Sequence, residues 1–121
     1  MEVDPDYPAE KVKFLQHNLH KRKEANLDIA SCITDKTIAL CQEPNQNKGK
    51  ITNISSGLRV VTGFCVKPRA CIILHPDIEF FQLNQFSDKD MVTITIKSKA
   101  NRTIVVSSVY MPFDSVDLPR Y

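Results

Sequence analysis

Two oxygen-bearing side chains stand where a pair of short apolar segments end. Asn18 lies near the end of segment 12–19 (VKFLQHNL), and Glu43 directly follows segment 37–42 (TIALCQ). If these segments are neighbouring parallel strands, they lie about 4.8 Å apart and their carboxyl ends share one edge of a sheet. Amide and carboxylate oxygens suit a hard cation such as Mg²⁺, which keeps several of its waters. The spacing therefore predicts a divalent-cation site at Asn18 and Glu43.

The same two residues also fit an arrangement without a metal. Asparagine is a good N-cap, so Asn18 can cap the helix that follows it, and Glu43 can be a solvated turn residue ahead of Pro44. Spacing alone leaves both interpretations open.

The elements that must position these residues follow from changes in hydrophobic period. In residues 21–34, Ala25, Ile29, Cys32 and Ile33 recur on one face of a helix. A helix between segments 12–19 and 37–42 makes a β-α-β unit, which requires parallel strands and a right-handed crossover. We also expect the first strand to be largely buried.

The rest of the chain predicts a loop and further strands. Residues 44–60 are rich in Asn, Lys, Ser and Gly and predict a long loop with a short strand at Ile51. The later strand candidates are 70–75, 78–82, 91–97 and 103–110, arranged as antiparallel pairs, with Pro76-Asp77 as the first turn. The fold class is therefore α/β, a mixed β-sheet with a helix. One helix cannot cover both faces of such apolar strands, so we expect a one-sided sheet covered by further helices or a partner.

Composition excludes some classes of protein and leaves others open. No apolar run approaches the roughly 20 residues of a membrane span, and the acidic first ten residues are unlike a signal peptide, which predicts an intracellular protein without a membrane partner. A net charge of +2 is too small to identify a nucleic-acid binder. Clusters of Lys and Arg fit either a phosphate-facing surface or an ordinary solvated face.

The cysteines and histidines do not predict a zinc site. Cys32, Cys41, Cys65 and Cys71 contain no CxxC pair and have no His at zinc-like intervals. Cys41 and Cys71 lie in apolar strand candidates and are expected to be buried as small hydrophobes, with Cys32 facing inward from the helix.

Four sequence blocks, in order, resemble the endonuclease-exonuclease-phosphatase superfamily: FLQHNLHKRKEA, IALCQEP, KPRACIILH and IVVSSVYMP. Within it they are most similar to the N-terminal endonucleases of non-LTR retrotransposon polyproteins. The resemblance covers about residues 11–113. It implies that residues 11–121 are the N-terminal part of such a domain after a polar lead-in, 1–10, and that they form half of a four-layer α/β sandwich whose second sheet lies beyond Tyr121.

The resemblance also assigns roles to residues. Asn18 matches an asparagine that organises the metal and phosphate site, Glu43 a metal-binding glutamate, and Tyr110 a tyrosine near the scissile phosphate. Arg69, in the KPRA block, matches a position that either contacts the DNA backbone or makes a structural pair. The family's later Gly-Asp-Phe-Asn-like and Ser-Asp-His-like motifs are absent, so the general base is missing.

The expected function is a Mg²⁺-dependent DNA endonuclease, with Mn²⁺ as the alternative cation, that nicks target DNA in the nucleus. It is expected to be incomplete and inactive alone, with the remainder of the domain and a reverse transcriptase in a longer polyprotein. Two alternatives remain open: a non-catalytic nucleic-acid-binding or interaction module, and a small-molecule phosphoesterase of the same fold.

Overall fold

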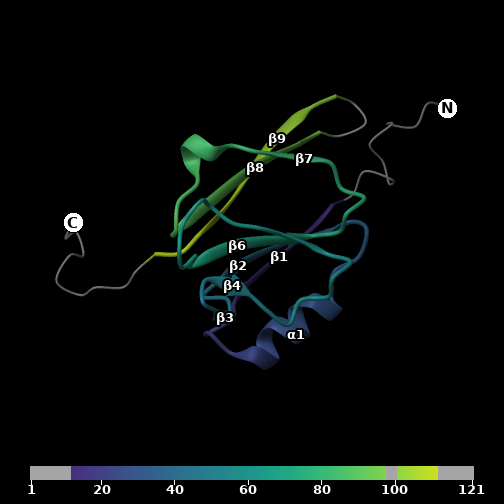
Figure 1. Ribbon diagram of the computed structural model, residues 1–121. Helices are drawn as coiled ribbons and strands as arrows, with labels where there is room; N and C mark the ends of the chain where they lie inside the picture. Colours follow the sequence, from purple (N-terminus) through teal and green to yellow (C-terminus); the bar gives the residue numbers. More distant parts are fainter. Residues whose placement is uncertain (1–11, 98–100, 112–121) are drawn as a thin grey trace, which may run out of the picture.

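Two β-sheets stack face to face in the computed structural model, which describes residues 12–97 and 101–111 (Figure 1). The elements in chain order are β1 (Lys13–Asn18), α1 (Lys23–Ser31), β2 (Thr37–Gln42), β3 (Gln46–Asn47), β4 (Lys50–Ile51), β5 (Arg59–Val61), β6 (Ala70–Leu74), β7 (Phe80–Gln82), the 3₁₀ turn η1 (Asn84–Phe86), β8 (Met91–Lys97) and β9 (Thr103–Val109). The lead-in 1–10 and the residues from 112 onward lie outside the described part of the chain.

The first sheet contains the predicted β-α-β unit. Its strand order is β1-β2-β6-β5, and β1 and β2 pair in parallel with Asn18 beside Gln42. β2 and β6 are antiparallel, and β6 lies between β2 and β5. The carboxyl ends of β1 and β2 therefore share one edge, as the strand prediction required.

The long apolar runs of β2 and β6 follow from burial on both faces. On one face, Ala39, Cys41, Cys71 and Ile73 pack with Leu19 and with Ile29 of α1. On the other face, Ile38, Ile72 and Leu74 pack against Val92, Ile94, Ile96 and Val106 of the second sheet, whose strand order is β7-β8-β9. Since buried strands need no alternation of polar and apolar residues, these two could be read from the sequence directly.

The prediction of a one-sided sheet was wrong, and so was the placement of a second sheet beyond Tyr121. The strands 80–82, 91–97 and 103–109 already form a second sheet, and it covers the face that was expected to be bare. The predicted hairpin at Pro76-Asp77 was also wrong. Both edges of β6 are occupied, by β2 and β5, so the chain leaves the first sheet and β7 pairs with β8 instead.

Two smaller predictions were also wrong, and a third was right only in part. β1 is mostly exposed, because among the described residues it pairs only with β2. α1 is shorter than expected and ends at Ser31, so Cys32 is its C-cap and is exposed rather than turned inward. In the expected loop 44–60, the short strand at Ile51 is confirmed as β4, but it forms a hairpin with β3, and the end of this range already belongs to β5.

The cross-strand thiol pair, Cys41 and Cys71, is buried as expected. A hydrogen bond from the Cys71 thiol to its neighbour Cys41, together with burial, raises the pKa of Cys71 well above the usual thiol value. In the described part of the chain, no helix has the length and apolar character needed to cross a membrane.

Candidate active site

Glu43 has a backbone conformation that few non-glycine residues adopt. Its φ is +50°, in the left-handed region, directly after β2. Two backbone bonds hold it there: Glu43 N–H donates to the Arg69 carbonyl at 2.8 Å, and Lys21 N–H donates to the Glu43 carbonyl at 2.8 Å. A strained residue held by its surroundings is a feature that clusters at functional sites.

The loop after Glu43 is fastened to α1 by a buried asparagine. The Asn26 side chain is 0% exposed. Its Nδ2 donates to the carbonyls of Asn45 (3.0 Å) and Thr52 (2.7 Å), and its Oδ1 accepts the Asn45 N–H at 3.1 Å. Asn45 Nδ2 in turn donates to the Lys21 carbonyl at 2.9 Å. These bonds fix the loop that follows Glu43 against α1 and the turn before it.

Asn18 lies at the neighbouring strand end. It is the register partner of Gln42, the residue before Glu43, and Leu19 N–H donates to the Gln42 carbonyl at 2.8 Å. The helix-cap interpretation was wrong, because the N-cap of α1 is Arg22 and makes no side-chain cap bond. Asn18 Oδ1 instead accepts the His20 N–H at 2.9 Å. That contact orients the amide at the end of β1, and the convergence of its oxygen with Glu43 on one cation stays a prediction.

Tyr110 reaches the site from the second sheet. The pKa of Tyr110 is raised by hydrogen bonding of its hydroxyl with the Glu43 carboxylate, by loss of hydration and by the charge of Glu43, while the positive charge of Arg69 acts in the opposite direction. The guanidinium of Arg69 lies over the Tyr110 ring, with Cζ 4.9 Å from the ring centre. Tyr110 and Glu43, far apart in sequence, are therefore in direct contact.

Asp90 completes the arrangement. Its carboxylate accepts two hydrogen bonds from Arg69, Nε to Oδ1 at 2.6 Å and Nη2 to Oδ2 at 2.8 Å, and the hydrogen bond to Asp90 raises the pKa of Arg69. Tyr110 N–H donates to the Asp90 carbonyl at 2.7 Å. Glu43, Arg69, Asp90 and Tyr110 together are called the site network below.

The site network decides one of the two alternatives predicted for Arg69, and it contains Asp90, which was not predicted as a site residue. Structural pairing, one of the two alternatives for Arg69, is observed. Asp90 was missed, because it stands in a turn before β8 without any recognisable motif. Its position directly before a long β-branched strand places Asp90 at a strand end, but nothing in the sequence connects it to Arg69.

Polar bonds between the sheets hold the strands that carry the network. Gln42 Nε2 donates to Ser108 Oγ at 3.2 Å, and Ser108 Oγ donates to the Cys41 carbonyl at 2.8 Å. Ser108 is two residues before Tyr110, and Gln42 is next to Glu43. The contact between Tyr110 and Glu43 is therefore supported from within the core.

The donor set fits a single Mg²⁺ ion that keeps most of its waters. Mg²⁺ is commonly held by one or two carboxylates with waters and substrate phosphate filling its shell, and here Glu43 supplies a carboxylate and Asn18 an amide oxygen. Across residues 12–97 and 101–111, no group of three or more His, Cys, Asp or Glu side chains could hold a metal. An all-protein cage such as a zinc site is therefore not formed by the described residues.

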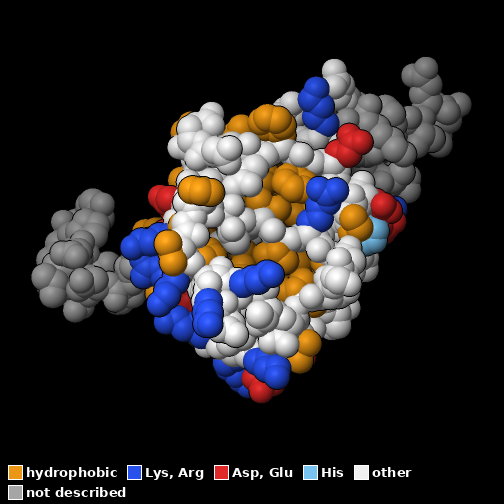
Figure 2. All heavy atoms as spheres, in the orientation of Figure 1, with side chains coloured by type: hydrophobic (Ala, Val, Ile, Leu, Met, Phe, Trp, Pro, Cys, Tyr) orange, Lys and Arg blue, Asp and Glu red, His pale blue; other side chains and the backbone are white. Residues whose placement is uncertain are grey.

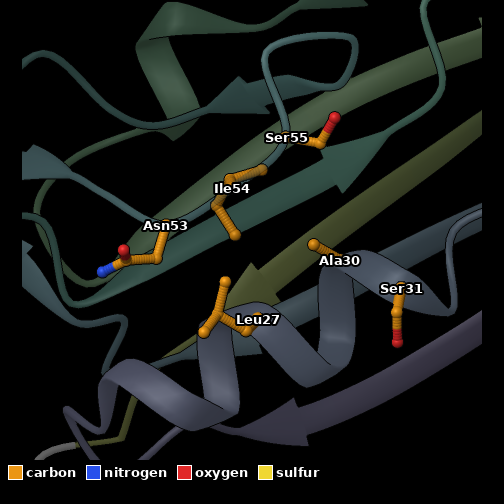
Figure 3. A pocket seen from close by; sticks show the side chains of 6 residues that line it. All are labelled: Leu27, Ala30, Ser31, Asn53, Ile54 and Ser55. Carbon is orange, nitrogen blue, oxygen red and sulfur yellow. The ribbon is translucent and has the colours of Figure 1, made fainter.

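Two grooves in the described part of the chain lie away from the site network. One, of about 410 Å³, is lined by Leu27, Ala30 and Ser31 of α1 and by Asn53, Ile54 and Ser55 (Figure 3). Its lining contains no titratable side chain. Another, of about 270 Å³, is bounded by β1 and α1 and includes His17, Asp28 and Cys32. Neither is lined by a residue of the site network, so neither is the candidate active site.

Comparison with known proteins supports the assignment of the fold. No protein-family model matches the sequence, and no curated protein matches it significantly. Among solved structures, the chain is similar to the endonuclease domain of TRAS1, a telomere-specific non-LTR retrotransposon, with a TM-score of 0.66 and 26% identity. The match covers 89% of this chain and 48% of that one, so this chain spans about half the length of the domain it matches. The expected resemblance is confirmed: this chain has an α/β fold similar to that of a non-LTR retrotransposon endonuclease domain.

Proposed function

We propose that this chain is part of a metal-dependent DNA endonuclease domain that nicks target DNA for a retrotransposon. The observation that carries the proposal is the contact of Glu43, held at the end of β2 with φ +50°, with Tyr110 from the second sheet. The similarity to the TRAS1 endonuclease domain supports a nuclease-like role for that arrangement. By the same analogy, nuclear DNA is the substrate and a reverse transcriptase belongs to the same polyprotein.

Each residue has a task in phosphodiester hydrolysis. Glu43 and Asn18 would hold Mg²⁺ or Mn²⁺, which when bound supplies positive charge to the phosphoryl oxygens and the leaving oxygen. When substrate binds, Tyr110 would donate its hydroxyl hydrogen bond to a phosphate oxygen instead of to Glu43, since a phenol is protonated at neutral pH. Arg69, fixed by Asp90, supports the Tyr110 ring from one face.

Activity would require residues that this chain does not contain. No aspartate or histidine occurs here in the sequence patterns that the resemblance implies for the general base. The chain also spans about half the length of the TRAS1 domain. We therefore expect the isolated chain to be inactive and expect nicking only from a longer chain that continues through the rest of the domain.

The test compares Glu43→Gln with wild type in such a longer chain. Nicking of supercoiled plasmid in Mg²⁺ should fall by at least about 100-fold, because the amide removes the charge that binds the cation. Glu79→Gln is the matched control, since Glu79 is exposed in the β6–β7 connection, and should nick like wild type. Undiminished nicking by Glu43→Gln would contradict the role of this carboxylate.

A non-catalytic DNA-binding module is the second candidate. It is favoured by the lack of a larger acidic cluster among the described residues. Salt-sensitive duplex binding without nicking by the longer chain would support this candidate over the endonuclease. Phosphate release from a small phosphoester, without plasmid nicking, would favour the phosphoesterase alternative.

A further inference from the structure

The loop between β5 and β6 carries two exposed apolar side chains next to the site network. Phe64 is 105% exposed and Val66 is 79% exposed. Three residues after Val66 the chain reaches Arg69. Single exposed apolar residues are common, but a fully exposed aromatic ring beside a candidate active site suggests a contact with another molecule. Residues 63–67 are called the apolar tip.

Side chains from other elements hold both ends of the apolar tip. Gln82 Nε2, at the end of β7, donates to the Thr62 carbonyl at 2.7 Å. Gln46 Nε2, in β3, donates to the Pro68 carbonyl at 2.8 Å, and Pro68 is buried. The loop is therefore tied to both sheets and to the β3-β4 hairpin.

Two glycines allow close backbone packing at the apolar tip. A Cβ at Gly63 would collide with the backbone of Asp88, and a Cβ at Gly49, whose φ is +81°, would collide with the carbonyl of Val66. The tip is thus packed between the turn before β8 and the β3-β4 hairpin. Phe64 is exposed although its backbone is held.

Cations surround this apolar tip. Lys48 and Lys50 flank Gly49 in the hairpin, and Lys67 lies in the tip itself. The carbonyl of Lys89 accepts the Arg69 N–H at 2.6 Å. All four lysines are exposed. Two acids also lie near the tip: Asp90 pairs with Arg69, whereas Asp88, whose Oδ1 accepts backbone N–H groups at 2.8 and 3.0 Å, keeps its negative charge. In Figure 2, blue cationic and orange apolar side chains lie together along the left-hand edge, where β9 ends in Figure 1.

The geometry points to the apolar tip as a wedge that inserts Phe64 between base pairs of duplex DNA while the surrounding lysines contact phosphates. Proteins that bend DNA combine these two features, apolar side chains that unstack a base step and cations along the backbone. A protein partner fits less well, because lysine is depleted in protein–protein interfaces. This inference rests on the proposed function, since it takes DNA as the ligand.

The experiment uses the 121-residue chain and a short duplex containing 2-aminopurine, whose fluorescence rises when the base is unstacked. It is done in EDTA, so that metal binding and nicking play no part. Saturating wild-type protein should raise the fluorescence severalfold. Phe64→Ser should abolish the rise and weaken binding about tenfold, the order of magnitude of one lost base–aromatic contact. The change cannot disturb the core, because Phe64 is fully exposed.

Two control variants separate the wedge from general binding. Phe81→Ser removes another exposed ring, 71% exposed on β7, and should keep both the rise and the affinity. Lys67→Ser should reduce the slope of the logarithm of the binding constant against the logarithm of salt concentration by about 1. It should keep the fluorescence rise at saturating protein.

Several results would overturn the inference. A full fluorescence rise with Phe64→Ser, or an equal loss with Phe81→Ser, would show that the apolar tip is not the wedge, while the proposed nuclease role would stand. Absence of duplex binding by the wild-type chain would refute the wedge, while the nuclease role would still be decided by plasmid nicking with the longer chain. Undiminished nicking by Glu43→Gln would count against the nuclease role and leave the wedge unaffected.

Discussion

Replacing Asn26 with alanine tests whether a buried amide in α1 holds the candidate active site. The change removes three hydrogen bonds, two donated to the carbonyls of Asn45 and Thr52 and one accepted from the Asn45 N–H. All three bonds are made by a side chain that is 0% exposed. The backbone groups of Asn45 and Thr52 that lose these bonds are therefore shielded from water that could replace them. At about 1 kcal/mol for each bond, the free energy of unfolding should fall by about 3 kcal/mol.

Urea unfolding followed by circular dichroism measures this loss. With a urea dependence of about 2 kcal/mol per molar, the midpoint should fall by about 1.5 M. Asn26→Asp keeps the size and the acceptor but loses both donors, and its carboxylate would face two carbonyls. It should therefore destabilise at least as much as Asn26→Ala at neutral pH.

The matched control is Asn84→Ala, which removes an exposed asparagine from η1 and should change the free energy of unfolding by less than about 0.5 kcal/mol. In the longer, active chain, Asn26→Ala should also lower nicking at temperatures where the protein stays folded, because Asn45 is two residues from Glu43. A midpoint for Asn26→Ala equal to that of Asn84→Ala would refute the reasoning.

Two further outcomes follow from the titratable groups. The pKa of Tyr110 is raised above its ordinary value near 10, first by its hydrogen bond to a carboxylate, so the folded chain retains a proton that the unfolded chain loses. Stability from this group is complete below pH 10 and is lost as pH rises through the folded pKa. Tyr110→Phe should therefore lose less stability than wild type between pH 9 and 11 in urea unfolding, and parallel curves would contradict this. In thiol labelling of the native chain, Cys32 and Cys65 should react while the cross-strand thiol pair reacts only on unfolding, and rapid labelling of all the cysteines would show that the pair is not buried.

The parts of the fold that the sequence predicted are those with strong local signals. β2 and β6 are continuous apolar runs because both faces are covered, and β8 and β9 are β-branched because each buries one face. The positions of Asn18 and Glu43 at neighbouring strand ends then followed from the rule for β-α-β units.

The errors came from interactions that have no local signal. Whether β7 folds back on β6 depends on β5, a strand of only three residues, which occupies the edge that β7 would need. Asn26 falls on the buried side of a helix where an apolar residue would be expected, and only its three partners explain it. Asp90 acquires its role from Arg69, 21 residues earlier.

The site network also explains how this chain, which spans about half the length of the TRAS1 domain, can hold the side chains of a candidate active site in place. Glu43 and Arg69 belong to the ends of the first sheet, and Asp90 and Tyr110 to the ends of the second. Their contacts therefore require the two sheets to pack in one register, which the apolar layer and the bonds of Ser108 to Gln42 and Cys41 provide. A shift of β9 by one residue would turn Tyr110 to the opposite face and remove it from Glu43. The core between the sheets thus determines the geometry of the site, and a substitution within that core can alter the site without touching any of its residues.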